Sequence, residues 1–189
     1  KKFFRAISKL FQKSTKKVAK EDKMQKEREK KMSIRFDNQN KTFYLTGEES
    51  SYIFRINGEG YLEHLYYGKR LSEESLTYLF DGVINDFSPS YLEWKNACLN
   101  VIPQEYAIYG RGDYRIPSVL IKMQNGSRIT DFRYKTHTIL NTKPTISNMP
   151  SLRGGETLVV TLEDKINRLE LDLYYTFYQG ISVVARRSV

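Results

Sequence analysis

Two short units in this sequence combine a carboxylate, an aromatic ring and a guanidinium group: Asp113-Tyr114-Arg115 and Asp131-Phe132-Arg133. On a β-strand, residues i and i+2 project from one face, so we expect each Asp to pair with its Arg while the ring points to the opposite face. Such pairs are typical of the rim of a β-sandwich, above buried rings. They would also suit a polar patch that binds a hydroxylated ligand or an adjoining domain, and the residues alone leave both interpretations open.

The first unit overlaps the tripeptide Arg111-Gly112-Asp113, which many adhesion proteins present to cell-surface receptors. A three-residue motif is a weak signal by itself. If Asp113 pairs with Arg115, as strand geometry predicts, its carboxylate is not free for a receptor. We therefore do not expect an adhesion function.

Other residues that carry chemistry are sparse. His64 and His137 each fall in a predicted strand among aromatic residues, without a second His or Cys at metal-ligand spacing. We therefore expect no metal site and no cofactor. The sequence contains no nucleophile-elbow pattern for a hydrolytic triad. Cys98 is the only cysteine, which excludes an intrachain disulfide framework and favours a reducing, cytoplasmic location.

The net charge of +9 belongs entirely to residues 1–31, which carry 13 Lys and Arg against four acids. The other 158 residues carry 18 basic and 18 acidic side chains, so we do not expect a nucleic-acid-binding core. In the leader, Phe3, Ile7 and Leu10 recur at helical spacing. This pattern fits a basic amphipathic helix on anionic lipid or, as we favour, a solvated helix or linker with no membrane contact.

Residues 32–189 show short alternating runs rich in β-branched and aromatic residues, which predict an all-β, antiparallel sandwich. The strand candidates are residues 42–46, 51–56, 61–67, 118–123, 128–134, 156–162, 168–178 and 181–189. Turns are predicted at residues 57–60 and, from Asn-Gly, at 124–127. A short helical turn is expected at 72–79. The last strand runs to the chain end without a stop signal, so we expect a domain truncated at its C-terminus.

Three blocks of the chain then carry a more specific pattern. They read NGEGYLEHLYYGKRL (57–71), QEYAIYGRGDYRIPSVLIKMQNGSRITDFRYKTHTILNTKP (104–144) and ETLVVTLEDKINRLELDLYYTFY (156–178). Together, and in this order, they resemble the N-terminal domain of family 36 glycoside hydrolases, the bacterial α-galactosidases. The resemblance covers residues 32–189 and leaves out the basic leader.

This resemblance implies a β-supersandwich packed against a (β/α)8 barrel, in oligomeric enzymes that remove terminal α-galactosyl residues from melibiose- or raffinose-like sugars with retention. Retention uses two carboxyl groups about 5–5.5 Å apart, and in this family both are barrel aspartates, with the nucleophile in a Lys-Trp-Asp sequence. The only tryptophan here is Trp94, in Leu-Glu-Trp-Lys. A barrel alone needs roughly 250 residues. We therefore expect no catalytic residue in this chain and no activity from it alone.

The resemblance further implies that this domain supports the barrel and the subunit interface and lends one carboxylate to the sugar pocket, from a loop before an aromatic-Ser-Pro sequence. The matching loop is residues 83–89, which read VINDFSP. The family's aspartate stands three places before the aromatic, where this chain has Ile84. The adjacent Asp86 is the candidate sugar-binding residue, Asp81 lies further upstream, and Lys95 stands where the family often has Arg. A stand-alone carbohydrate-binding or interaction module is the alternative.

Overall fold

The computed structural model describes residues 33–72, 76–80, 91–92, 97–150, 152, 154–178 and 181–189. Its strands are β1 (Ser33–Asp37), β2 (Thr42–Thr46), β3 (Ser50–Ile56), β4 (Leu62–Lys69), β5 (Tyr91–Leu92), β6 (Ala97–Cys98), β7 (Arg133–Leu140), β8 (Glu156–Asp164), β9 (Leu169–Phe177) and β10 (Val184–Ser188). A short 3-10 helix, η1 (Thr77–Phe80), overlaps the end of the helical turn predicted at 72–79. In these ranges no helix is long and apolar enough to cross a membrane. The basic leader lies outside the described residues.

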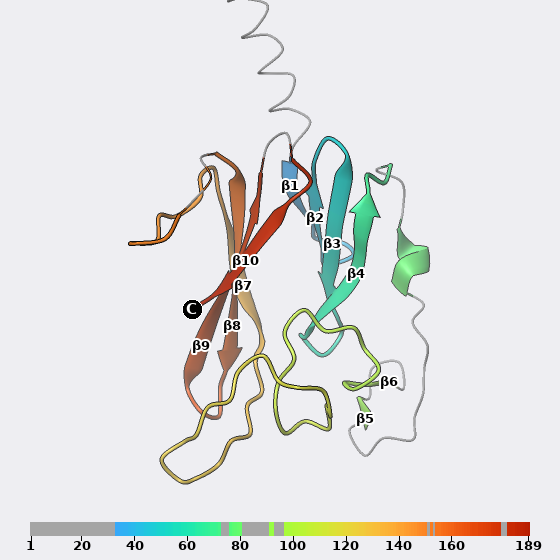
Figure 1. The fold of residues 1–189 in the computed structure, drawn as a ribbon. Coiled ribbons are helices and arrows are strands. Elements are labelled where there is room, and N and C mark those ends of the chain that lie inside the picture. The colour runs from blue at the N-terminus through green and yellow to red at the C-terminus, as the bar shows by residue number, and fades with distance from the viewer. Residues whose placement is uncertain are drawn as a thin grey trace, which may run out of the picture.

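Two four-stranded antiparallel sheets form the domain, in the orders β1-β2-β3-β4 and β10-β9-β8-β7. Figure 1 shows them side by side, with β5 and β6 pairing separately near one end of the first sheet. Consecutive strands are neighbours in each sheet. Short turns join β1 to β2, β2 to β3, β3 to β4 and β8 to β9, whereas a longer connection, residues 141–155, joins β7 to β8. The turn at 57–60 is one of the short turns, closed by a hydrogen bond from Gly60 N to Asn57 O of 3.0 Å.

The core lies between the two sheets and follows the period-2 alternation of the strands. Phe43, Leu45 and Phe54 come from the first sheet and are fully buried. Leu158 and Tyr175 meet them from the second sheet, and the rings of Phe54 and Tyr175 stack with centroids 4.8 Å apart. Burying each such side chain contributes about 1.5–3 kcal/mol, so both sheets depend on this shared layer. The predicted antiparallel sandwich is confirmed.

The outer face of the first sheet is also covered. Tyr44, Ile53 and Leu76 are buried together there, and Leu79 of η1 packs against them. The strand β3 is therefore enclosed on both faces, and its residues Ser50–Arg55 are all buried.

The segment 107–132 differs from the prediction. The Asn125-Gly126 turn forms as expected, with Met123 N donating to Ser127 O at 2.8 Å. No strand is assigned on either side of it, and the regular strand begins only at Arg133. Isolated backbone bonds, such as Ser118 N to Ala107 O at 2.9 Å, hold this segment instead of a continuous ladder. Val119 and Ile121 pack, partly buried, against the core, while Leu120 between them is 59% exposed, so the side chains alternate but no strand of the described residues pairs with this backbone.

Candidate functional site

The sequence-predicted sugar contact cannot be placed. Asp86 and the rest of the loop 83–89 lie outside the described residues, as do Asp81 and Lys95. The assignment of Asp86 therefore stays a prediction. The polar clusters that the structure does describe lie on the segments that follow this loop and on the two sheets.

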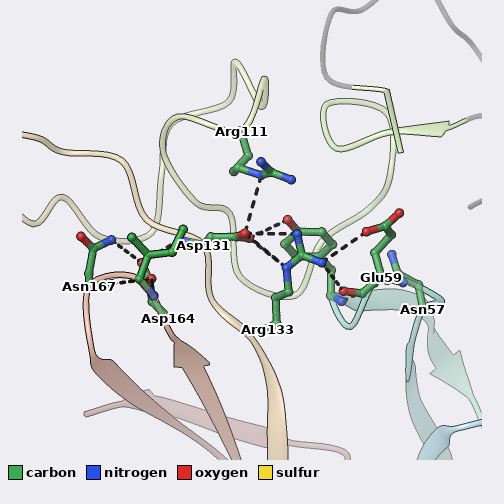
Figure 2. Close-up of polar contacts among 9 residues, drawn as sticks. Asn57, Glu59, Arg111, Asp131, Arg133, Asp164 and Asn167 are labelled. Atoms are coloured by element: carbon green, nitrogen blue, oxygen red, sulfur yellow. Dashed lines mark hydrogen bonds and ion pairs between the residues drawn. The ribbon is translucent and has the colours of Figure 1, made fainter. Parts of the chain in front are cut away.

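The second Asp-aromatic-Arg unit forms the centre of one cluster, shown in Figure 2. Arg133 Nη2 donates to Asp131 Oδ2 at 3.1 Å, and Arg133 Nη1 reaches the backbone oxygen of Glu59 at 3.0 Å. The hydroxyl of Tyr61 donates to Asp131 Oδ1 at 2.6 Å. Burial, followed by this hydrogen bond, raises the pKa of Tyr61 to about 12. Arg111 approaches the same carboxylate at 3.8 Å. The network thus ties the 57–60 turn to the start of β7.

Asp164 extends this cluster to the β8–β9 turn. Its Oδ1 accepts backbone N–H bonds from Ile166 and Asn167, while Oδ2 accepts from Asp131 N at 2.9 Å and Asn167 Nδ2 at 2.6 Å. Burial works to raise the pKa of Asp164, but these hydrogen bonds outweigh it and hold the pKa below its usual value. The carboxylate is therefore ionised at neutral pH, and its acceptor sites are filled.

A cleft of about 400 Å³ opens over this cluster, between Glu59, Arg133 and the 163–166 turn. Its two most buried acids, Asp131 and Asp164, already receive donors from the protein, so neither is left as a proton acceptor or nucleophile. In the described part of the chain, no group of three or more His, Cys, Asp and Glu could hold a metal ion. The hydrogen bonds of this cluster hold the 57–60 turn, the segment before β7 and the β8–β9 turn in place relative to one another.

The first unit forms a second cluster. Asp113 has a fully buried side chain and accepts from Arg115 Nε at 2.8 Å and from Gln104 Nε2 at 2.6 Å. Arg115 Nη2 also donates to the backbone oxygen of Leu99. The predicted Asp–Arg pairing is confirmed, and the buried carboxylate is closed to an adhesion receptor.

The strand geometry assumed for this first unit is wrong. Residues 113–115 belong to no strand, and Tyr114 is 74% exposed, whereas Phe132 of the second unit is buried as expected. In the first unit the pairing comes from a turn in which Arg115 N donates to Asp113 Oδ1 at 3.1 Å. Side chains in such a turn do not alternate between faces, so the ring is free to point outward.

A third cluster surrounds Glu105, a residue for which no sequence pattern indicated a role. Its carboxylate is 1% exposed and accepts from the hydroxyls of Tyr52 at 2.8 Å and Tyr175 at 3.1 Å. His64 Nδ1 lies 2.6 Å from it and Arg186 Nη2 lies 3.0 Å away. Burial, followed by the charge of Glu105, raises the pKa of both tyrosines. Glu105 thereby joins both sheets through a single carboxylate.

The two histidines both contact aromatic residues. His64 serves the Glu105 cluster, with its ring 5.1 Å from that of Tyr52. His137 packs on Phe43 with ring centroids 5.0 Å apart and shares a 2.7 Å hydrogen bond with Tyr134. Burial lowers the pKa of His137, which favours its neutral form. The hydroxyl beside His137 belongs to Tyr134, not to a serine or threonine.

A signal in the sequence was available for Asp164 but not for Glu105. Asp164 precedes Asn167 in a turn, a spacing at which an Asp side chain commonly accepts backbone N–H bonds. The partners of Glu105 lie 41 to 81 residues away. No local pattern brings them together.

Comparison with known proteins gives these clusters a context. The family model described as "Glycosyl hydrolase family 36 N-terminal domain" matches residues 60–189. The chain is 34% identical to "Alpha-galactosidase AgaA" of Geobacillus stearothermophilus over 82% of this chain and 22% of that protein. It is 33% identical to "Alpha-galactosidase Mel36A" of Lactobacillus acidophilus over 81% of this chain and 22% of that protein.

Solved structures agree with the sequence comparisons. The α-galactosidase AgaB of Geobacillus stearothermophilus superposes with a TM-score of 0.74 at 33% identity, over 83% of this chain and 22% of that one. The α-galactosidase of Lactobacillus brevis gives 0.75 at 33% identity, over 82% and 22%. The chain thus spans about a fifth of the length of these relatives. Variants of AgaA were crystallised with raffinose and with stachyose.

Proposed function

The chain belongs to glycoside hydrolase family 36, whose N-terminal domain it matches, and from that membership we propose that it is the non-catalytic sandwich of an α-galactosidase. The observation that carries the proposal is the agreement of sequence and fold with the N-terminal fifth of such enzymes. The whole enzyme would hydrolyse terminal α-galactosyl residues with retention, on a barrel outside residues 1–189. Sugars such as raffinose and stachyose, each found bound to a variant of AgaA, are the proposed substrate class.

The domain's own role in this proposal is mechanical and positional. Retaining hydrolysis needs two carboxyl groups held about 5–5.5 Å apart, and a rigid neighbouring domain helps to keep a pocket in such a geometry. The three clusters around Asp131, Asp113 and Glu105 provide that rigidity because they fix loops and sheets to one another. We further propose that the domain contributes to a homo-oligomer interface and functions in the cytoplasm, in keeping with its single cysteine, Cys98.

A domain exchange tests this function. We expect a chimera in which residues 32–189 replace the matching N-terminal segment of AgaA to hydrolyse raffinose, while AgaA without that segment loses activity because its pocket lacks support. Activity is measured as galactose release, with circular dichroism to confirm folding. A folded but inactive chimera would contradict the proposal. Saturable galactose binding by residues 32–189 alone would instead support a stand-alone carbohydrate-binding module.

The pocket residue is tested in the same chimera. If Asp86 accepts hydrogen bonds from the sugar, Asp86→Ala should lower kcat/KM by about tenfold to a hundredfold, since a hydrogen bond to a charged group contributes about 1.5–3 kcal/mol. Asp81→Ala removes a nearby carboxylate and serves as the matched control, with kinetics expected to equal those of the parent chimera. Equal kinetics in the Asp86 variant would remove Asp86 from the pocket and leave the domain assignment intact.

A further inference from the structure

A separate groove of about 260 Å³ lies between the β7–β8 connection and the strands β9 and β10. Pro144, Ile146 and Met149 line it from the connection, and Thr176 and Ala185 line it from the paired strands. In Figure 1 these elements are the orange loop and the adjoining brown and red strands, away from the turn that carries Asp164. The groove is therefore distinct from the cleft over Asp131.

Three cations line this groove, Lys143, Arg186 and Arg187, and no acid does. Arg186 is neutralised by Glu105 at 3.0 Å. Arg187 lies over the ring of Tyr174 at 4.0 Å, and Lys143 lies over the ring of Tyr178 at 5.6 Å. A cation–π contact of this kind contributes about 0.5–1 kcal/mol at exposed sites and leaves the positive charge uncompensated.

The half-buried Arg187 and Lys143 form no ion pair with any described carboxylate. Asp172, two residues before Tyr174 on the same strand, instead accepts a hydrogen bond from Thr161 at 2.6 Å. In the cleft over Asp131, by contrast, the lining Arg133 forms ion pairs with Asp131 and Glu59. Placing two like charges in a groove without a counter-charge is unfavourable unless an anion joins them.

We propose that this groove binds a small organic anion: a compact apolar body that carries one carboxylate or phosphate group. The apolar body would lie against Pro144, Ile146 and Met149, and the anionic group would lie between Lys143 and Arg187, whose guanidinium presents paired donors to oxyanions. An anion would compensate the charges of Lys143 and Arg187, which a neutral sugar would leave uncompensated. The site is thus additional to the proposed galactoside pocket.

Calorimetric titration of the 189-residue chain tests the site with four probes. Phenyl phosphate and benzoate carry both an apolar ring and an anion, while phenol and inorganic phosphate carry one feature each. We expect phenyl phosphate, benzoate or both to bind at least tenfold more tightly than phenol and inorganic phosphate. Comparison of the two tighter probes distinguishes a phosphate ligand from a carboxylate ligand.

Charge-neutral variants locate the binding. Arg187→Gln and, independently, Lys143→Gln should each weaken the better probe at least tenfold, since each removes a charge-assisted contact. Lys165→Gln makes the same charge change at an 82% exposed side chain in the β8–β9 turn and should leave binding unchanged. Thermal unfolding confirms that each variant is folded. Equal affinity in both groove variants, equal weakening by Lys165→Gln, or no saturable binding at millimolar probe would overturn the proposal.

Discussion

Glu105→Ala is expected to lower the free energy of unfolding by about 3–4 kcal/mol. The substitution removes the carboxylate that pairs with the guanidinium of Arg186 and accepts hydrogen bonds from the buried hydroxyls of Tyr52 and Tyr175. Removing one partner of a buried ion pair typically costs about 3–5 kcal/mol, and each buried hydroxyl left without a hydrogen-bond acceptor costs about 1–3 kcal/mol more. The lower total allows for water reaching Arg186, whose side chain is 44% exposed.

Urea unfolding followed by circular dichroism measures this loss as a shift of the midpoint at constant slope. The matched control is Glu170→Ala, which removes a carboxylate that is 61% exposed and contacts Lys135 on the sheet surface. Exposed pairs contribute about 0–1 kcal/mol, so the control should unfold close to the parent midpoint. If the two variants lost equal stability, Glu105 would not be the link between the sheets.

Gly155→Ala is the second substitution expected to have a large effect. Gly155 has a φ of +93°, and a Cβ there would lie 2.6 Å from the backbone oxygen of Phe177, at the pairing of β8 with β9. A side chain in this left-handed region costs about 1–2 kcal/mol. The clash with backbone adds about 1–3 kcal/mol, as overpacking generally does. We therefore expect a total loss of about 3 kcal/mol.

A substitution at the neighbouring Gly154 distinguishes the cost of the left-handed backbone from the cost of the clash. Its φ is +82°, and a Cβ there meets nothing within 4 Å. Gly154→Ala should therefore lose the backbone cost alone, about 1–2 kcal/mol, in the same urea experiment. If the Gly155 variant were as stable as the Gly154 variant, the backbone at the end of β9 would have to shift away from the added methyl group at no cost, and the predicted clash would be wrong.

The strand pattern was predictable for β2, β3, β4, β8, β9 and β10, whereas β1 was not among the strand candidates and only the start of β7 was. In β9, the alternation of Leu171, Leu173 and Tyr175 identified the core face, and these side chains are buried as expected. The same reasoning was wrong for 118–123, although Val119 and Ile121 pack against the core and Leu120 between them is 59% exposed. Alternating side chains show which face is buried, but they do not show whether a neighbouring strand is in place to form the backbone ladder. A strand therefore forms only where tertiary packing supplies that neighbour.

The polar clusters likewise divide into contacts that the local sequence predicts and contacts that depend on how the sheets pack. Asp113 and Asp131 each pair with the arginine two residues later, and the sequence determined this by itself because partners so close in the chain meet in a turn as well as in a strand. Only the tertiary structure decided that Glu105 would be the buried carboxylate between the sheets. Its partners lie on four different strands, 41 to 81 residues away. Contacts over such distances follow from how the sheets pack, which no local spacing of residues encodes.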